Sequence, residues 1–203
     1  MYLVKISDKI FMLMKHIIDE EIIVDSHLSL EEVLRQRQAL PAPQKVLDKQ
    51  RIVEVTYYSF DGRLHQGQIV VDVDLVTDVK GAFDLIRIIK FPVKSVIPFV
   101  DRRLMSEEEK ASSMNNSSAF NYRLIANTNK LSNHAFGRAF DINPALNPLI
   151  KGDEVLPLAT KYDTKVPGTI VGDEEFVIYL KSLGWEWGGE WTDIKDFMHF
   201  EKP

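Results

Sequence analysis

The sequence predicts an α+β fold with a mainly antiparallel sheet and flanking helices. Stretches rich in β-branched and aromatic residues predict short strands, and apolar residues at helical spacing predict helices between them. These strands and helices are mixed without the regular alternation that builds a parallel sheet. With 203 residues, the chain is long enough for one well-buried domain plus an extension.

The first forty or so residues are expected to be helical. Apolar residues recur at helical spacing between positions 10 and 18, and Ser29 with Glu32 fits a capping box that opens a second helix. Pro41-Ala-Pro43 then interrupts the pattern. The segment is either an extension packed on the main domain, which we favour, or an independent partner-binding element. We divide the chain into a helical N-terminal extension, residues 1–45, and a main domain, residues 46–203.

A β-hairpin and a helix are predicted next. Residues 52–58 have strand composition, Asp61-Gly62 supplies a hairpin turn, and a second strand is expected over residues 68–73. Four apolar residues then share one face of a predicted helix that ends before Phe91-Pro92: Val76, Val79, Phe83 and Ile86.

The remaining elements are shorter. A strand is expected over residues 94–100, and Ser106 with Glu109 predicts a capped helix over about residues 107–114. Residues 138–142 alternate as a strand does, and a terminal strand is expected at His199-Phe200. Between these two strands we expect a loop over residues 144–172 and then a helix capped by Asp173 and ended by Gly184.

Composition excludes some sites and argues against some partners. The net charge of −5 and a pI near 5.6 argue against a general nucleic-acid binder, which normally has a basic face. The absence of cysteine excludes disulfides and Cys-ligated zinc. No stretch approaches the ~20 apolar residues of a membrane span, so no integral membrane segment is expected.

Two segments carry side chains that can bind a metal. Ser132 to Asp141 includes His134 and Asp141, and the C-terminal Asp-Phe-Met-His-Phe contains His199. Two neutral imidazoles and one carboxylate suit a zinc ion with one position left open for water, which is typical of catalytic zinc. Gly137 permits the close turn between the first two ligands, and Ala139 keeps the neighbouring strand position small.

A carboxylate beside the metal would complete a hydrolytic site. Asp196 lies three residues before His199 and is the first candidate for the group that takes a proton from water and passes it to the leaving amine. Glu190 is the reserve candidate, and a role in orienting a ligand histidine is the alternative for Asp196. His65 follows the hairpin turn and is interpreted as a hydrogen-bonded structural residue rather than a fourth ligand.

These motifs resemble the zinc D-alanyl-D-alanine carboxypeptidase family, which includes L-alanyl-D-glutamate endolysins and shares its fold with the hedgehog domain. The resemblance is carried by Ser-x-His-x-x-Gly-x-Ala-x-Asp at residues 132–141 and Asp-x-x-His at residues 196–199. Flanking segments resemble the endolysin-like branch: Phe60–Gly67, Ser118–Arg123, Asp141–Pro144 and Gly184–Gly189. The resemblance extends from about residue 51 to residue 201, and Met198 replaces the Pro or Trp often found before the last histidine.

The resemblance implies a role for each matched residue. His134, Asp141 and His199 match the zinc ligands, and Asp196 matches the catalytic acid/base. Arg123 matches an arginine that holds a substrate carbonyl or carboxylate, and Ser132 matches a position near the substrate. The three tryptophans either line a groove for a cell-wall peptide or pack around Gly188-Gly189.

The implied activity is hydrolysis of a peptidoglycan stem peptide by a zinc metallopeptidase. An L-Ala–D-Glu endopeptidase and a D-Ala carboxypeptidase both fit, and the flanking motifs favour the endolysin-like branch without selecting a bond. The alternative from another class is a non-catalytic zinc-containing module that binds cell wall or protein. The substrate implies a location in the cell envelope or outside the cell, although no signal peptide is visible; release at lysis, a processed chain or another export route would reconcile the two.

Overall fold

The longest strands form an antiparallel hairpin in the computed structural model, which describes residues 21–36, 40–100 and 105–203. β2 (Gln50–Tyr58) pairs with β3 (Leu64–Asp72) along its whole length. The turn at Asp61-Gly62 is closed by the Gly62 N–H, which donates to the Ser59 carbonyl at 2.9 Å. The predicted hairpin is therefore confirmed, with a second strand that begins earlier than expected.

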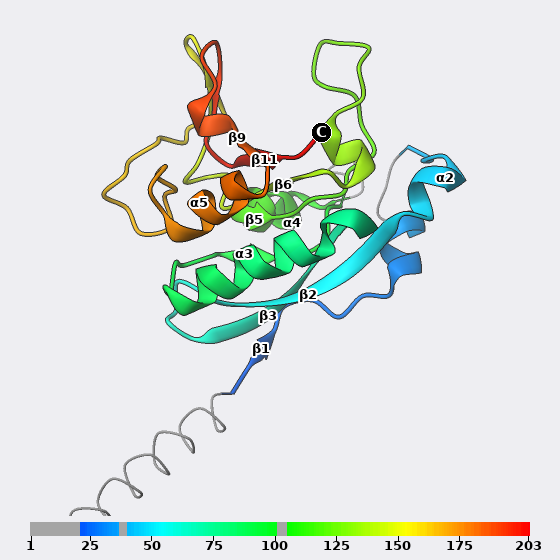
Figure 1. Ribbon diagram of the computed structural model, residues 1–203, viewed down its shortest axis with the longest axis horizontal. Helices are drawn as coiled ribbons and strands as arrows, with labels where there is room; N and C mark the ends of the chain where they lie inside the picture. Colours follow the sequence, from blue (N-terminus) through cyan, green and yellow to red (C-terminus); the bar gives the residue numbers. More distant parts are fainter. Residues whose placement is uncertain (1–20, 37–39, 101–104) are drawn as a thin grey trace, which may run out of the picture.

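A long helix lies between this hairpin and a second small sheet (Figure 1). It is α3 (Val76–Ile88), and the predicted apolar face is confirmed because Val79, Phe83 and Ile86 are buried. The second sheet has the order β6–β11–β9, and its strands are β6 (Ala139–Asp141), β11 (His199–Glu201) and β9 (Glu186–Trp187). A single buried apolar cluster joins the hairpin, the helix and this sheet, so the sheet has a fixed support.

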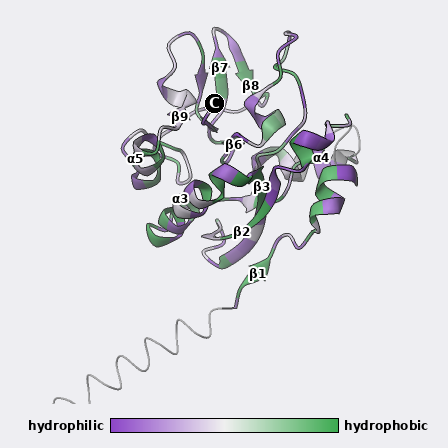
Figure 2. Cartoon of the chain, turned by 45° about the vertical axis from the view of Figure 1, so that its right-hand side comes forward, coloured by the Kyte–Doolittle hydropathy of each residue, from purple (hydrophilic) through white to green (hydrophobic). Residues whose placement is uncertain are grey.

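α5 (Glu175–Ser182) packs beside α3. Figure 2 shows hydrophobic and hydrophilic residues side by side on both helices, as expected of helices with one face on a core. Gly184 follows α5 with a φ of 85°, as predicted for a helix stop. The predicted cap was wrong by one residue, because Glu174 occupies the N-cap and its side chain makes no capping hydrogen bond.

The described part of the N-terminal segment packs on the hairpin. β1 (Ile23–Val24) pairs in parallel with β3, and two short helical segments follow, η1 (Glu32–Gln36) and α2 (Gln44–Leu47). The capping box is confirmed, since the Ser29 N–H donates to Glu32 Oε2 at 2.8 Å and the Glu32 N–H donates to Ser29 Oγ at 3.2 Å. β1 was not predicted, and the helix expected over residues 10–18 lies outside the described residues.

Two further short strands pair in parallel. They are β4 (Ser95–Val96) and β5 (Asn116–Ser117), and the segment between them contains α4 (Glu107–Ser112) and η4 (Ser113–Asn115). The capping box that opens α4 is confirmed by the Ser106 N–H, which donates to Glu109 Oε2 at 2.7 Å. The strand expected over residues 94–100 is thus much shorter than predicted.

The segment expected to be a loop over residues 144–172 contains a hairpin, so that expectation was wrong. Its strands are β7 (Leu149–Lys151) and β8 (Glu154–Leu156), and β7 also pairs with β10 (Lys195–Asp196). The α+β class is confirmed, but the described strands form several small sheets with both parallel and antiparallel pairs rather than one main sheet. Within the described ranges, no helix has the length and apolarity needed to cross a bilayer.

Candidate metal centre

The register of two antiparallel strands brings Asp141 and His199 together. β6 and β11 pair so that these two residues lie directly opposite each other. Side chains alternate along a strand, so the adjacent residues Phe140 and Phe200 point to the other face, where both are fully buried and stack on each other. Burial of these two rings therefore fixes which face carries the polar pair.

His134 reaches the same place from a short helical turn, η5 (Asn133–Phe136). Ser132 caps this turn, and its hydroxyl accepts a hydrogen bond from the His134 N–H at 3.3 Å. Gly137 ends the turn with a φ of 68°, and a Cβ there would lie 2.1 Å from Gln50 Oε1. The predicted need for glycine is confirmed, because the turn requires both a left-handed backbone and close approach to the β2–β3 hairpin.

Three ligand atoms converge, one from each of these side chains. They all lie within 4.8 Å of one another, which makes His134, Asp141 and His199 a group that can hold a metal ion. His134 Nε2 lies 3.2 Å from His199 Nδ1, and the Asp141 carboxylate lies 3.3 Å from the first nitrogen and 3.0 Å from the second. The convergence that the sequence could not establish is thus present in the structure.

Hydrogen bonds on the far side of each ring orient the lone pairs inward. His134 Nδ1 donates to the Ala119 carbonyl at 2.7 Å, and His199 Nε2 donates to Glu201 Oε2 at 2.9 Å. A neutral imidazole has one hydrogen, so the inward nitrogens of both rings then present lone pairs toward a carboxylate that also only accepts. Three electron-pair donors directed at one point fit a bound cation, and the His₂Asp donor set fits zinc.

Without a cation, a proton stabilises this group of acceptors. Burial would lower the pKa of His199, but hydrogen bonds to Asp141 and Glu201 outweigh burial and raise that pKa to about 10. Burial would likewise raise the pKa of Asp141, yet the two neighbouring imidazoles hold it far below its ordinary value. The proton on His199 therefore competes with a metal, whose binding would release it.

Asp196 lies close enough to this group to respond to its charges. Burial, followed by the negative charge of Asp141, raises the pKa of Asp196 to about 7, while the charges of His199 and Arg123 oppose the increase. Its Oδ1 atom is buried and has no hydrogen-bond partner among the described residues. Such a carboxylate is suited to gain and lose a proton near neutral pH.

A cavity of about 680 Å³ gives access to the group. Its wall includes His134, Asp141, Arg123 and Met198. Arg123 is held near the site by backbone pairing, because the Ser132 N–H donates to the Arg123 carbonyl at 3.1 Å. Its guanidinium donates to the neighbouring Leu124 carbonyl at 3.3 Å, and in the cavity wall it can also donate to a bound carbonyl or carboxylate.

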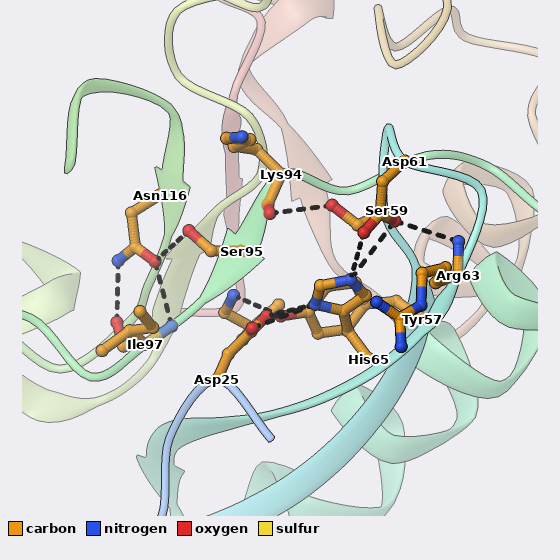
Figure 3. Close-up of polar contacts among 11 residues, drawn as sticks. Asp25, Tyr57, Ser59, Asp61, Arg63, His65, Lys94, Ser95, Ile97 and Asn116 are labelled. Carbon is orange, nitrogen blue, oxygen red and sulfur yellow. Dashed lines mark hydrogen bonds and ion pairs between the residues drawn. The ribbon is translucent and has the colours of Figure 1, made fainter. Parts of the chain in front are cut away.

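Several residues singled out in the sequence lie elsewhere. Glu190 forms an ion pair with Lys181 at 2.5 Å, on η6 (Gly188–Glu190), and is not part of the three-residue group. Ser132 is not among the residues that line the cavity, and its hydroxyl serves as the cap before His134. His65 pairs with two aspartates, Asp25 and Asp61 (Figure 3), as expected of a hydrogen-bonded structural residue.

The tryptophans divide into two kinds. Trp185 and Trp187 are buried in the main apolar cluster, and their indole N–H groups donate to Asp78 and to the Phe197 carbonyl. Trp191 is partly exposed, and its ring centroid lies 5.4 Å from that of His199. Packing thus accounts for the first two, while Trp191 lies beside the site.

Glu201 was missed in the sequence. It orients His199 and has a lowered pKa, because hydrogen bonds to His199 and Asn133 outweigh the effect of its burial. The sequence did contain a signal for it. Glu201 lies two residues after the candidate ligand His199 on the same strand, and alternate residues of a strand share one face.

Comparison with known proteins gives one family. Residues 126–202 match the model of a family described as D-alanyl-D-alanine carboxypeptidase. The predicted resemblance to the zinc D-alanyl-D-alanine carboxypeptidase family is confirmed over this segment, which contains all three residues of the metal-capable group and Asp196. No match was found among curated proteins or among solved structures.

Proposed function

We propose that this protein is a zinc-dependent peptidase that hydrolyses a bond in the stem peptide of peptidoglycan. The observation that carries the proposal is the convergence of two inward imidazole nitrogens and the Asp141 carboxylate on the wall of a cavity. The family match over residues 126–202 supports a peptidase. A partly buried carboxylate with a pKa near 7 at the same place supports hydrolysis over binding alone.

His134, Asp141 and His199 would hold the ion, with the Ala119 carbonyl and Glu201 fixing the two rings. Bound zinc lowers the pKa of water and polarises a carbonyl group. Asp196 accepts the proton of the water that attacks the peptide carbonyl carbon, and then donates it to the departing amine as the C–N bond breaks. Arg123 holds a carbonyl or carboxylate of the peptide through its guanidinium.

Asp196 is a better candidate for the base than Glu190. The pKa of Asp196 responds to the charges of Asp141 and His199, whereas the Glu190 carboxylate is engaged with Lys181. We keep the proposal that Ser132 lies near the substrate, because its hydroxyl caps the turn that carries the proposed ligand His134. The bond cleaved is either L-Ala–D-Glu or the terminal D-Ala, as in the endolysin-like and carboxypeptidase relatives respectively.

The proposal also covers the fold, the domain division and the location expected from the sequence. We propose a peptidase fold shared with the hedgehog domain, with the peptidase domain over residues 46–203 and an extension over residues 1–45. We propose that the protein acts in the cell envelope or outside the cell. The non-catalytic binding module remains the rival function, and it requires no ionisable group at Asp196.

Digestion of purified peptidoglycan by the zinc-loaded protein, with fragments identified by mass spectrometry, tests the proposal. We expect new amine and carboxyl ends at one stem-peptide bond, which also identifies that bond. The absence of any new end would overturn the enzyme assignment and favour the binding module.

Asp196→Asn tests the proposed base. The amide retains the shape of the carboxylate but cannot accept the proton, so the rate should fall about 10²- to 10⁴-fold. Zinc content, measured by atomic absorption, should stay at the level of the parent protein. Near-normal turnover would show that another group is the base.

A further inference from the structure

Asp196, the proposed base, is held in place through its backbone. Its buried Oδ1 atom has no hydrogen-bond partner in the described part of the chain. The strand that carries it, β10, is only two residues long and pairs with β7, where Asp196 lies opposite Leu149. A group that transfers a proton needs a fixed position, so the residues that hold this short strand bear on the reaction.

Phe197, the next residue, is fixed at three points. Its N–H donates to the Pro148 carbonyl at 3.3 Å, and its carbonyl accepts from the Trp187 indole N–H at 3.0 Å. Its ring stacks on the ring of Tyr162, with 3.6 Å between the centroids and 8° between the planes. Since Phe197 directly follows Asp196, these contacts limit where the Asp196 carboxylate can lie.

Tyr162 lies in the irregular segment between β8 and α5 and is itself anchored. Its hydroxyl donates to the Ile170 carbonyl at 2.6 Å. Burial raises the pKa of Tyr162, so the hydroxyl keeps the proton that it donates. Ile170 is fully buried in the main apolar cluster, and the Tyr162 ring is thereby tied to the core of the domain.

The anchor of Tyr162 leads back to the strand that carries Asp141. The Ile170 N–H donates to Asn147 Oδ1 at 2.7 Å, and Asn147 Nδ2 donates to the Ile142 carbonyl at 3.2 Å. Asn147 is fully buried, and Ile142 directly follows Asp141. A continuous set of contacts therefore joins this strand to β10 through the Tyr162 ring.

We propose that Tyr162 is a positioning residue for Asp196. Its ring holds Phe197, and with it the end of β10, so that the Asp196 carboxylate stays beside the metal-capable group. Tyr162 is not among the residues that line the cavity, so it acts through Phe197 rather than on a bound peptide. This inference rests on the proposed function, in which Asp196 is the base.

Tyr162→Leu tests the role, because it removes the ring and leaves an apolar side chain in its place. The pentapeptide L-Ala-γ-D-Glu-L-Lys-D-Ala-D-Ala contains both candidate bonds and serves as the substrate. We expect kcat per zinc-loaded molecule to fall about 10- to 100-fold, the effect of a small displacement of a reacting group, while KM stays at the parent value. Zinc content, measured by atomic absorption, should stay unchanged.

Two further variants separate positioning from general packing. Tyr162→Phe keeps the stacked ring and loses only the hydroxyl, so its kcat should lie within about fivefold of the parent value. Tyr179→Leu is the matched control, because Tyr179 is also partly buried against the main apolar cluster but packs over Gly81 on α3. Its kcat should equal that of the parent.

Asp196→Asn shows whether Tyr162 acts through the base. In a protein that already lacks the base, Tyr162→Leu should cause no further loss of kcat, because both changes remove the same contribution. A further loss as large as in the parent background would overturn the positioning role. The same holds for a zinc content that falls in step with the rate, since Tyr162 would then support the metal ligands instead.

The remaining outcomes separate this inference from the proposed function. If the parent cleaves the pentapeptide and Tyr162→Leu is equally fast, the positioning role is wrong and the proposed function stands. If the parent does not cleave it, the proposed function fails for this substrate, and crystal structures of the parent and Tyr162→Leu decide the positioning. A changed distance between the Asp196 and Asp141 carboxylates supports it, and an unchanged distance overturns it.

Discussion

Single side chains in the candidate site depend on partners that the sequence does not reveal. His199 can direct Nδ1 toward the other donors because Glu201 accepts from its opposite nitrogen at 2.9 Å. His134 is fixed in the same way by the Ala119 carbonyl. The residue pattern therefore predicts the donor set, while the tautomer of each ring follows from the fold.

Glu201→Gln tests the role of the negative charge behind His199. The variant keeps an oxygen that can accept from the ring but removes the charge that increases its basicity, so zinc affinity should fall about tenfold or more. Competition with a chelator of known affinity measures the change. Glu154→Gln, at an exposed position on β8, is the matched control. Equal zinc affinity of both variants and the parent would exclude this role for Glu201.

Asp196 should make the metal-free protein less stable as the pH rises. Its pKa is about 7 in the folded state and near 3.8 when unfolded, so the folded state binds more protons and loses stability between about pH 4 and pH 7. Asp196→Asn removes this loss. Between pH 5 and pH 8 the variant should gain roughly 2–3 kcal/mol relative to the parent, since each pKa unit is worth about 1.4 kcal/mol.

Thermal melts of both proteins in chelator at these two pH values give the difference. Other titrating groups change stability as well, but they are common to the two proteins, and the contributions of those that do not interact with Asp196 cancel. A difference in Tm that is the same at pH 5 and at pH 8 would contradict the assignment of a raised pKa to Asp196.

At the scale of elements, the turn that carries His134 depends on Gly137. Alanine there would have to adopt a φ of 68° and place its Cβ 2.1 Å from Gln50 Oε1 and 2.7 Å from the Asp72 N atom. Gly137→Ala should therefore lower the free energy of unfolding by about 3 kcal/mol or more. Gly62→Ala is the control, because Gly62 has a similar φ of 76° but no atom within 4 Å of its Cβ position.

The Gly62 variant should lose only about 1–2 kcal/mol, the cost of the left-handed backbone. Urea denaturation measures both values. Equal losses for the two variants would mean that the close contacts with β2 and β3 add nothing to the requirement for glycine at Gly137.

Elements with strong local signals were predicted well, and those formed by distant contacts were not. The Asp61-Gly62 hairpin and the apolar face of α3 follow from turn chemistry and helical spacing. The β7–β8 hairpin has proline and glycine nearby, and one of its strands also pairs with β10, more than forty residues later in the chain. β1 is only two residues long and pairs in parallel, so no periodicity could reveal it.

At the scale of the molecule, the residue types of the site follow from the sequence, whereas their convergence depends on contacts between distant segments. The sequence predicted which side chains can bind a metal, but His134 and His199 are 65 residues apart and meet only because β6 and β11 pair. Asp25 gave no signal, since its partner His65 lies 40 residues away and across a parallel pairing. The residues of the cavity wall come from segments far apart in the chain, so the sequence alone did not predict which of them would meet.

Zinc should stabilise the folded protein because its proposed ligands come together only when distant segments are paired. A ligand that binds only the folded state adds about 2.7 kcal/mol at a free concentration of one hundred times Kd. For a chain of 203 residues this corresponds to an increase in Tm of about 5–10 °C. Calorimetry with zinc, with chelator, and with zinc restored measures the effect. His134→Gln, which loses one proposed ligand, should show a much smaller increase, and an increase equal to that of the parent would place the zinc elsewhere.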